Sequence, residues 1–127
     1  MENKCIKNIE VGKFYLIHDG SKTGHPGFVI WKNDIYNLYL FIKVGTTKNN
    51  NNEILKESLS NDKATHYIYK RPFLGKRKDF GSKVFKDMLV SEELKSLADI
   101  ISKTNPVESQ SINRKDRYHF KKLFFHK

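Results

Sequence analysis

The tripeptide Gly24-His25-Pro26 stands where a polar loop meets an apolar run, and its histidine is the first candidate for chemistry. Gly24 allows a sharp bend, while Pro26 fixes its own φ and pushes His25 toward extended backbone. An imidazole exchanges protons near neutral pH, so a histidine held at the start of a strand suits a general acid or base. The alternative is a histidine that only hydrogen-bonds its own loop.

Gly45-Thr46-Thr47 is the second candidate, because it places two hydroxyls directly after an apolar run. Such hydroxyls can bond a phosphate oxygen or orient a ribose 2′-OH. Threonines at the end of a strand are also common turn formers. Thr46 and Thr47 are therefore candidate catalytic residues together with His25.

The segment from Lys70 to Lys78 has five cations in nine residues and no acid. Lysine and arginine neutralise phosphates, and an aromatic ring can stack on a base. We therefore predict base stacking by Tyr69 and Phe73. The predicted phosphate-binding residues are Lys22, Lys70, Arg71, Arg77 and Lys78. The alternative is a solvated basic loop with Phe73 in the core.

The net charge also indicates a partner rich in phosphate. Twenty-four Lys and Arg residues stand against fourteen Asp and Glu, which leaves +10. Lysine outnumbers arginine twenty to four, so the arginines stand out as the planar forks suited to phosphate or guanine. A lysine-rich solvated surface is the alternative.

Several classes of protein are poorly supported. The sequence has no phosphate-binding Gly-x-x-x-x-Gly-Lys loop, no Gly-x-Ser-x-Gly elbow and no zinc-spaced Cys or His set. We expect no cofactor and no metal. No apolar run is long enough for a membrane span, and no apolar signal region opens the chain. Cys5 is a lone cysteine, which fits a reducing compartment, so we expect a cytoplasmic protein.

Strand-like segments come first along the chain, and a helix follows them. The expected strands are 12–17, 27–31, 38–44 and 65–69, with a turn at 32–34 and a mobile polar loop at 48–52. Ser91 begins a helix to Lys103, with Val90, Leu94, Leu97 and Ile101 as its apolar face. This order favours an α+β or mainly-β fold over a parallel α/β sheet.

The C-terminal part is predicted to be a tail that could grip nucleic acid, cover the sheet or bind a partner protein. Residues 1–106 form the expected domain, and residues 107–127 form a basic, aromatic tail. A linker is expected at 107–112, followed by a terminal helix or strand.

The order of these signals resembles the MazF/PemK-like toxins of bacterial toxin–antitoxin modules. The residues that carry it are Gly12-x-x-Tyr15-Leu16-Ile17, Pro26 before an apolar strand, Gly45-Thr46-Thr47, and the helix at Ser91-Glu92-Glu93-Leu94. The resemblance covers about residues 10 to 103. It implies a small SH3-like antiparallel barrel with helices packed on it, usually a homodimer. It also implies a metal-independent endoribonuclease, in which the ribose 2′-OH attacks the adjacent phosphate, and a cognate antitoxin of protein or RNA.

This chain departs from the family where His25 stands in place of the usual arginine. Arginine is a permanent cation, whereas histidine is a better proton shuttle. We therefore expect His25 to act as general acid or base, while Lys70, Arg71 or Arg77 supplies the positive charge. Either Thr46 or Thr47 matches the family hydroxyl.

Two other functions remain open at this stage. The chain could bind nucleic acid without cleaving it, as a regulator or an accessory protein of a mobile element. It could also be a protein-interaction module whose Tyr and Phe residues bind an acidic partner.

Overall fold

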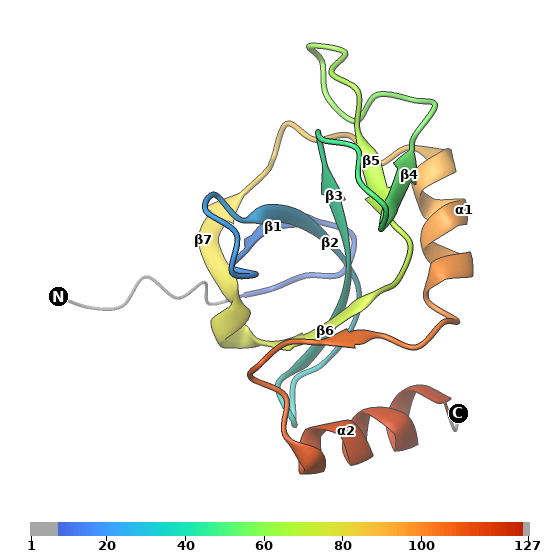
Figure 1. The fold of residues 1–127 in the computed structure, drawn as a ribbon. Coiled ribbons are helices and arrows are strands. Elements are labelled where there is room, and N and C mark those ends of the chain that lie inside the picture. Colours follow the sequence, from blue (N-terminus) through green and yellow to red (C-terminus); the bar gives the residue numbers. More distant parts are fainter. Residues whose placement is uncertain (1–7, 126–127) are drawn as a thin grey trace, which may run out of the picture.

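The computed structural model describes residues 8–125, a small and mostly antiparallel β-sheet domain with two helices toward its C-terminal end (Figure 1). Cys5 and His126 lie outside the described residues. The strands are β1 (Phe14–Ile17), β2 (His25–Asn33), β3 (Leu38–Gly45), β4 (Asn52–Ile54), β5 (Tyr67–Tyr69), β6 (Phe73–Lys76), β7 (Phe80–Val84) and β8 (Val107–Glu108). The helices are α1 (Glu92–Ile101) and α2 (Arg114–Phe120), with a 3-10 turn at Arg77–Asp79 and a π-helical turn at Lys121–Phe125. The α+β, mainly-β class is confirmed.

Strand β3 is the centre of the sheet, because it pairs along both of its edges. β2 runs antiparallel along one edge. On the other edge, β5 pairs with the Gly45 end of β3 and β6 pairs with the Leu38 end. The longest path through the sheet is β4-β5-β3-β2-β1-β7. All eight residues of β3 are buried, which explains its nearly continuous apolar sequence.

β2 and β3 form an antiparallel hairpin, whose turn differs from the predicted one. β2 continues through Asn33, which pairs with Leu38, so the turn predicted at 32–34 is wrong. The chain reverses over the next four residues instead. Asn33 Oδ1 accepts from the backbone N–H of Tyr36 at 3.0 Å, and Asn37 has a φ of 59°. Asparagine tolerates this left-handed conformation better than most residues.

Helix α1 covers one side of the sheet as its amphipathic pattern predicts. The Ser91 side chain accepts from Leu94 N–H, which confirms the predicted N-cap. Leu94, Ala98 and Ile101 are buried against sheet residues. Val90 is 38% exposed, so its assignment to the buried face is wrong. No helix within residues 8–125 is long and apolar enough to cross a bilayer.

The asparagine-rich tract is more ordered than its composition suggests. Asn52 is the first residue of β4 and is buried. Its side-chain amide donates to the Thr47 carbonyl, and its Oδ1 accepts from Asn49 N–H, both at 3.0 Å. Local hydrogen bonds of side-chain amides with the backbone can hold a turn in place without buried apolar residues. The prediction of a loop at 48–52 is therefore wrong for Asn52, which belongs to a strand.

Residues 107–125 add to the sheet and the core. The linker predicted at 107–112 begins with β8, which pairs parallel to β6. Of the two predicted alternatives for the segment after this linker, a helix or a strand, the structure has the helix, α2. Phe120 is 2% exposed and packs in a cluster with Leu38, Leu40 and Leu74. Figure 1 shows α2 close to the end of the β2–β3 hairpin.

Candidate active site

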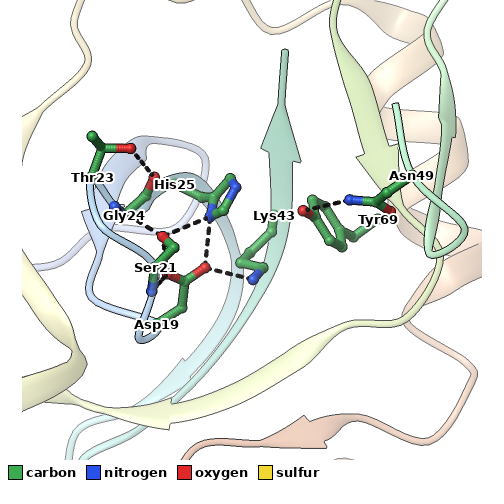
Figure 2. Close-up of polar contacts among 8 residues, drawn as sticks. All are labelled: Asp19, Ser21, Thr23, Gly24, His25, Lys43, Asn49 and Tyr69. Atoms are coloured by element: carbon green, nitrogen blue, oxygen red, sulfur yellow. Dashed lines mark hydrogen bonds and ion pairs between the residues drawn. The ribbon is translucent and has the colours of Figure 1, made fainter. Parts of the chain in front are cut away.

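His25, the first residue of β2, is bound to the carboxylate of Asp19 in the loop after β1 (Figure 2). Nδ1 of His25 lies 2.6 Å from Oδ2 of Asp19. An ionised carboxylate has no proton to donate, so the Nδ1–H group of the ring donates this bond. In the neutral ring, Nε2 then carries a lone pair, which is the form of a general base.

The loop from residue 18 to residue 24 is folded around the same carboxylate. Ser21 donates to Asp19 Oδ1 through its hydroxyl at 2.6 Å and through its backbone N–H at 3.1 Å. The Ser21 hydroxyl accepts from Gly24 N–H at 3.0 Å. Gly24 has a φ of 73°, and a Cβ there would lie 2.6 Å from the Ile17 carbonyl oxygen. A glycine is therefore required at the bend that delivers His25.

Lys43 places a positive charge on the same oxygen of Asp19 that His25 contacts. Its Nζ lies 2.6 Å from Asp19 Oδ2 and sits over the rings of Tyr69 and Phe73, at 4.7 and 4.4 Å from their centroids. Lys43 belongs to the buried strand β3 and is 7% exposed. The carboxylate and the two aromatic faces compensate the cost of burying its ammonium group.

Asp19 stays ionised across the physiological pH range. Burial opposes its ionisation, but hydrogen bonds from Lys43, Ser21 and His25 together outweigh burial and hold the pKa of this carboxyl well below its usual range. The bond to this fixed carboxylate orients the His25 ring.

A pocket of about 250 Å³, the His25 pocket, brings His25 together with both predicted threonines. Its lining residues are Thr23, Gly24, His25, Pro26, Gly45, Thr46, Thr47, Asn49, His66 and Tyr69. The sheet explains this convergence, because the Gly45 end of β3 lies between β2 and β5. A Cβ on Gly45 would lie 3.3 Å from His25 Cδ2 and 3.8 Å from Tyr69 Cε1. The missing side chain keeps the pocket open.

Tyr69 separates the His25 pocket from a second one of about 500 Å³, which Phe73 also lines. Both residues are partly exposed, but Phe73 also packs against the core, with its ring stacked on that of Phe41. The Tyr69 hydroxyl accepts from the Asn49 amide at 3.2 Å, and its ring meets His25 edge to face at 5.7 Å between centroids. The structure thus places both predicted stacking residues next to the His25 pocket.

The predicted phosphate-binding residues divide between the two ends of β3. Lys70 and Arg71 are exposed and line the second pocket, beside Tyr69. The Arg71 guanidinium also donates to the carbonyls of residues 105 and 106, at 2.9 and 3.2 Å. Lys22 is exposed in the loop next to Thr23, which lines the His25 pocket.

Arg77 and Lys78 lie away from His25. They follow Lys76, which pairs with Leu38 at the end of β3 opposite Gly45. An eight-residue strand separates its ends by about 24 Å. One guanidinium nitrogen of Arg77 donates to the Tyr39 hydroxyl at 3.2 Å. The expectation that Arg77 supplies positive charge beside His25 is wrong, since Lys43 occupies that place.

Asp19, Lys43, Asn49 and His66 belong to this site although the sequence reasoning did not select them. A single lysine within an apolar strand is a signal for Lys43. His66 immediately precedes a strand, as His25 follows a bend into one. Asp19 gave no signal beyond a turn next to Gly20. Among residues 8–125, no three His, Cys, Asp or Glu side chains are grouped as a metal site.

The chain was compared with protein-family models, with curated proteins and with solved structures, and none of them matches it. The functional argument therefore depends on the geometry of the site.

Proposed function

We propose that this protein is a metal-independent endoribonuclease of a toxin–antitoxin system, with an SH3-like barrel, acting on RNA through the His25 pocket. The observation that carries this proposal is that His25, whose ring is oriented by Asp19, lines one pocket together with Thr46 and Thr47. An oriented base beside hydroxyl donors is the arrangement that transfer of a phosphodiester to a 2′-OH needs.

In this reaction, Nε2 of His25 takes the proton from the ribose 2′-OH. The 2′ oxygen then forms a bond to the adjacent phosphorus, and the bond from phosphorus to the 5′ oxygen breaks. The products are a 2′,3′-cyclic phosphate and a free 5′-OH. Thr46 or Thr47 donates to a non-bridging phosphate oxygen, and Lys43 offsets the charge of Asp19 beside the base.

The second pocket gives the RNA strand a path beyond the scissile phosphate. Tyr69 and Phe73 offer partly exposed rings for a flanking base, and Lys70 and Arg71 offer cations for its phosphate. The family resemblance adds a homodimer and a cognate antitoxin, of protein or RNA, to this proposal.

The test is incubation of the purified protein with mixed RNA in EDTA. We expect discrete fragments with 2′,3′-cyclic phosphate ends. His25→Ala should slow cleavage by about 10³-fold, because general base catalysis contributes about 10²–10⁴-fold. Of the two variants Thr46→Ala and Thr47→Ala, the one that cleaves RNA more slowly identifies the catalytic hydroxyl. His119→Ala, which removes an imidazole outside the His25 pocket, is the matched control.

Two outcomes would contradict the assignment. Cleavage that survives chelation and all three pocket substitutions would place the chemistry elsewhere. A salt-dependent gel shift without cleavage products would favour the alternative, a barrel that binds nucleic acid without cleaving it. The exposed Lys70 and Arg71, which lie beside Tyr69 and Phe73, support this alternative.

A further inference from the structure

His66 is a second imidazole on the wall of the His25 pocket, and the mechanism above leaves it unused. It directly precedes β5, and its backbone carbonyl accepts from Leu55 N–H at 2.9 Å. This bond extends the β4–β5 pairing by one residue and fixes the backbone of His66. The imidazole thus belongs to the framework of the pocket, in the same way as His25.

The side chain of His66 is buried without the partner that a buried imidazole normally has. The residue is 7% exposed, and its Nδ1 has no hydrogen-bond partner within the described part of the chain. A buried polar atom left unpaired costs about 1–3 kcal/mol, so native structures keep few of them. An unpaired polar atom in the wall of a pocket requires an explanation, and a role of His66 in that pocket would supply one.

The sheet sets the two histidines on opposite sides of Gly45. His25 begins β2, and His66 precedes Tyr67, which pairs with Gly45 from the β5 side. Because adjacent strands lie about 4.8 Å apart, the backbones of β2 and β5 are separated by about 10 Å across β3. This separation of the two backbones is wider than a phosphate group, and both histidines line the same pocket.

We propose that His66 is the general acid that protonates the leaving 5′ oxygen, opposite His25 as the general base. This inference rests on the proposed nuclease function. In phosphoryl transfer the attacking and leaving oxygens lie roughly in line through phosphorus, so the acid and the base must act from opposite sides. His25 is assigned as the base, because its Nδ1–H is bound to Asp19 and its Nε2 accepts the 2′-OH proton.

The proton balance is complete with these two residues. The 2′-OH proton passes to His25 as the bond between the 2′ oxygen and phosphorus forms. The bond between phosphorus and the 5′ oxygen breaks, and the proton of the His66 imidazolium passes to that oxygen. Exchange with water then deprotonates His25 and reprotonates His66. No metal or other co-reactant enters the step.

A modified leaving group tests this assignment directly. The substrate is an RNA that the wild-type protein cuts, prepared with either oxygen or sulfur at the bridging 5′ position of the cleaved bond. A thiolate leaves without protonation, so only the oxygen substrate needs a general acid. We expect His66→Ala to cut the oxygen substrate about 10²–10⁴-fold more slowly than wild type and the sulfur substrate at nearly the wild-type rate.

The controls separate this proposal from a structural role and from the nuclease proposal itself. His25→Ala should be slow on both substrates, and His119→Ala should match wild type on both. Equal slowing of His66→Ala on both substrates, or no slowing on either, overturns the acid role. His66→Gln, which keeps a polar side chain of similar size, should show the same selective defect if His66→Ala unfolds.

A measurement that does not depend on cleavage completes the test. Histidine side-chain NMR signals are followed while inorganic phosphate is added. We expect the signals of His25 and His66 to shift at the same phosphate concentration, with that of His119 unchanged. A stationary His66 signal overturns the contact with phosphate. If wild type cuts no RNA but both signals shift, the nuclease proposal fails while the two-imidazole phosphate site stands.

Discussion

Two largely buried aspartates, Asp19 and Asp79, each accept several hydrogen bonds, but their partners differ in kind. Asp79 accepts from Lys76 N–H at 2.7 Å and from the hydroxyls of Ser109 and Ser111 at 2.8 and 3.0 Å. These donors have no proton chemistry near neutral pH, and they tie the segment after β8 to the end of β6. Asp79 is therefore part of the scaffold.

Asp19 accepts instead from an imidazole and an ammonium group, which border three pockets between them. Its network connects a loop to β3 and ends at an imidazole that lines the His25 pocket. Burial and hydrogen bonding of a carboxylate therefore do not identify a functional site. The chemistry of the donors distinguishes the two aspartates, since Asp79 and its serine donors also line a pocket.

The largest difference should appear in RNA cleavage. Asp19→Asn keeps the shape of the side chain but removes the carboxylate that accepts from His25 Nδ1–H and orients the ring. We expect cleavage to fall by about 10²–10³-fold, measured as initial rates at saturating RNA. Asp79→Asn is the matched variant and should stay within about threefold of wild type per folded molecule. Equal losses in both variants would erase the distinction.

For stability we expect the opposite order, with the larger effect from substitution of Asp79. Asp79→Ala leaves one backbone N–H and two hydroxyls without their acceptor. We expect the free energy of unfolding to fall by about 2–3 kcal/mol, measured by urea denaturation. The cleavage rate of the folded fraction should remain near that of wild type. A cleavage defect larger than the loss of folded protein would argue against a purely structural Asp79.

The smallest expected effect is in the pH dependence of stability. The pKa of Asp19 is lower in the folded state than in the unfolded chain. Its contribution is therefore complete above the unfolded pKa, near 4, and is lost as pH falls toward the folded pKa. The stability gap between wild type and Asp19→Asn should narrow by roughly 1–2 kcal/mol between pH 5 and pH 2.5. A difference in stability that stays constant over this pH range would mean that the partners of Asp19 do not lower its pKa.

The sequence predicted those parts of the fold that depend on local chemistry. The apolar run before Gly45, the bend at Gly24 and the cap at Ser91 all depend on neighbouring residues, and all appear in the structure. The turn after Asn33 was misplaced, because strand pairing with β3 extends β2 beyond its apolar residues. β8 was missed for a related reason: its pairing with β6 joins residues more than thirty positions apart.

The candidate site shows the same division. His25, Thr46 and Thr47 were found because His25 directly follows Gly24 and the two threonines follow Gly45 at the end of a strand. Asp19 and Lys43 were not, since their pairing spans 24 positions and depends on the antiparallel arrangement of β1 to β3. Arg77 was misassigned, because nearness to Arg71 in the sequence says nothing about which end of β3 a residue occupies.

The opposite walls of the His25 pocket are anchored by very different lengths of chain. β2 and β3 contribute nine and eight residues, whereas β4 and β5 contribute three each. Short ladders open at lower free energy than long ones in the middle of a sheet. A ligand in the His25 pocket would therefore contact one rigid wall, which carries His25, and one more compliant wall, which carries Tyr69 and His66 and can adjust to the shape of that ligand.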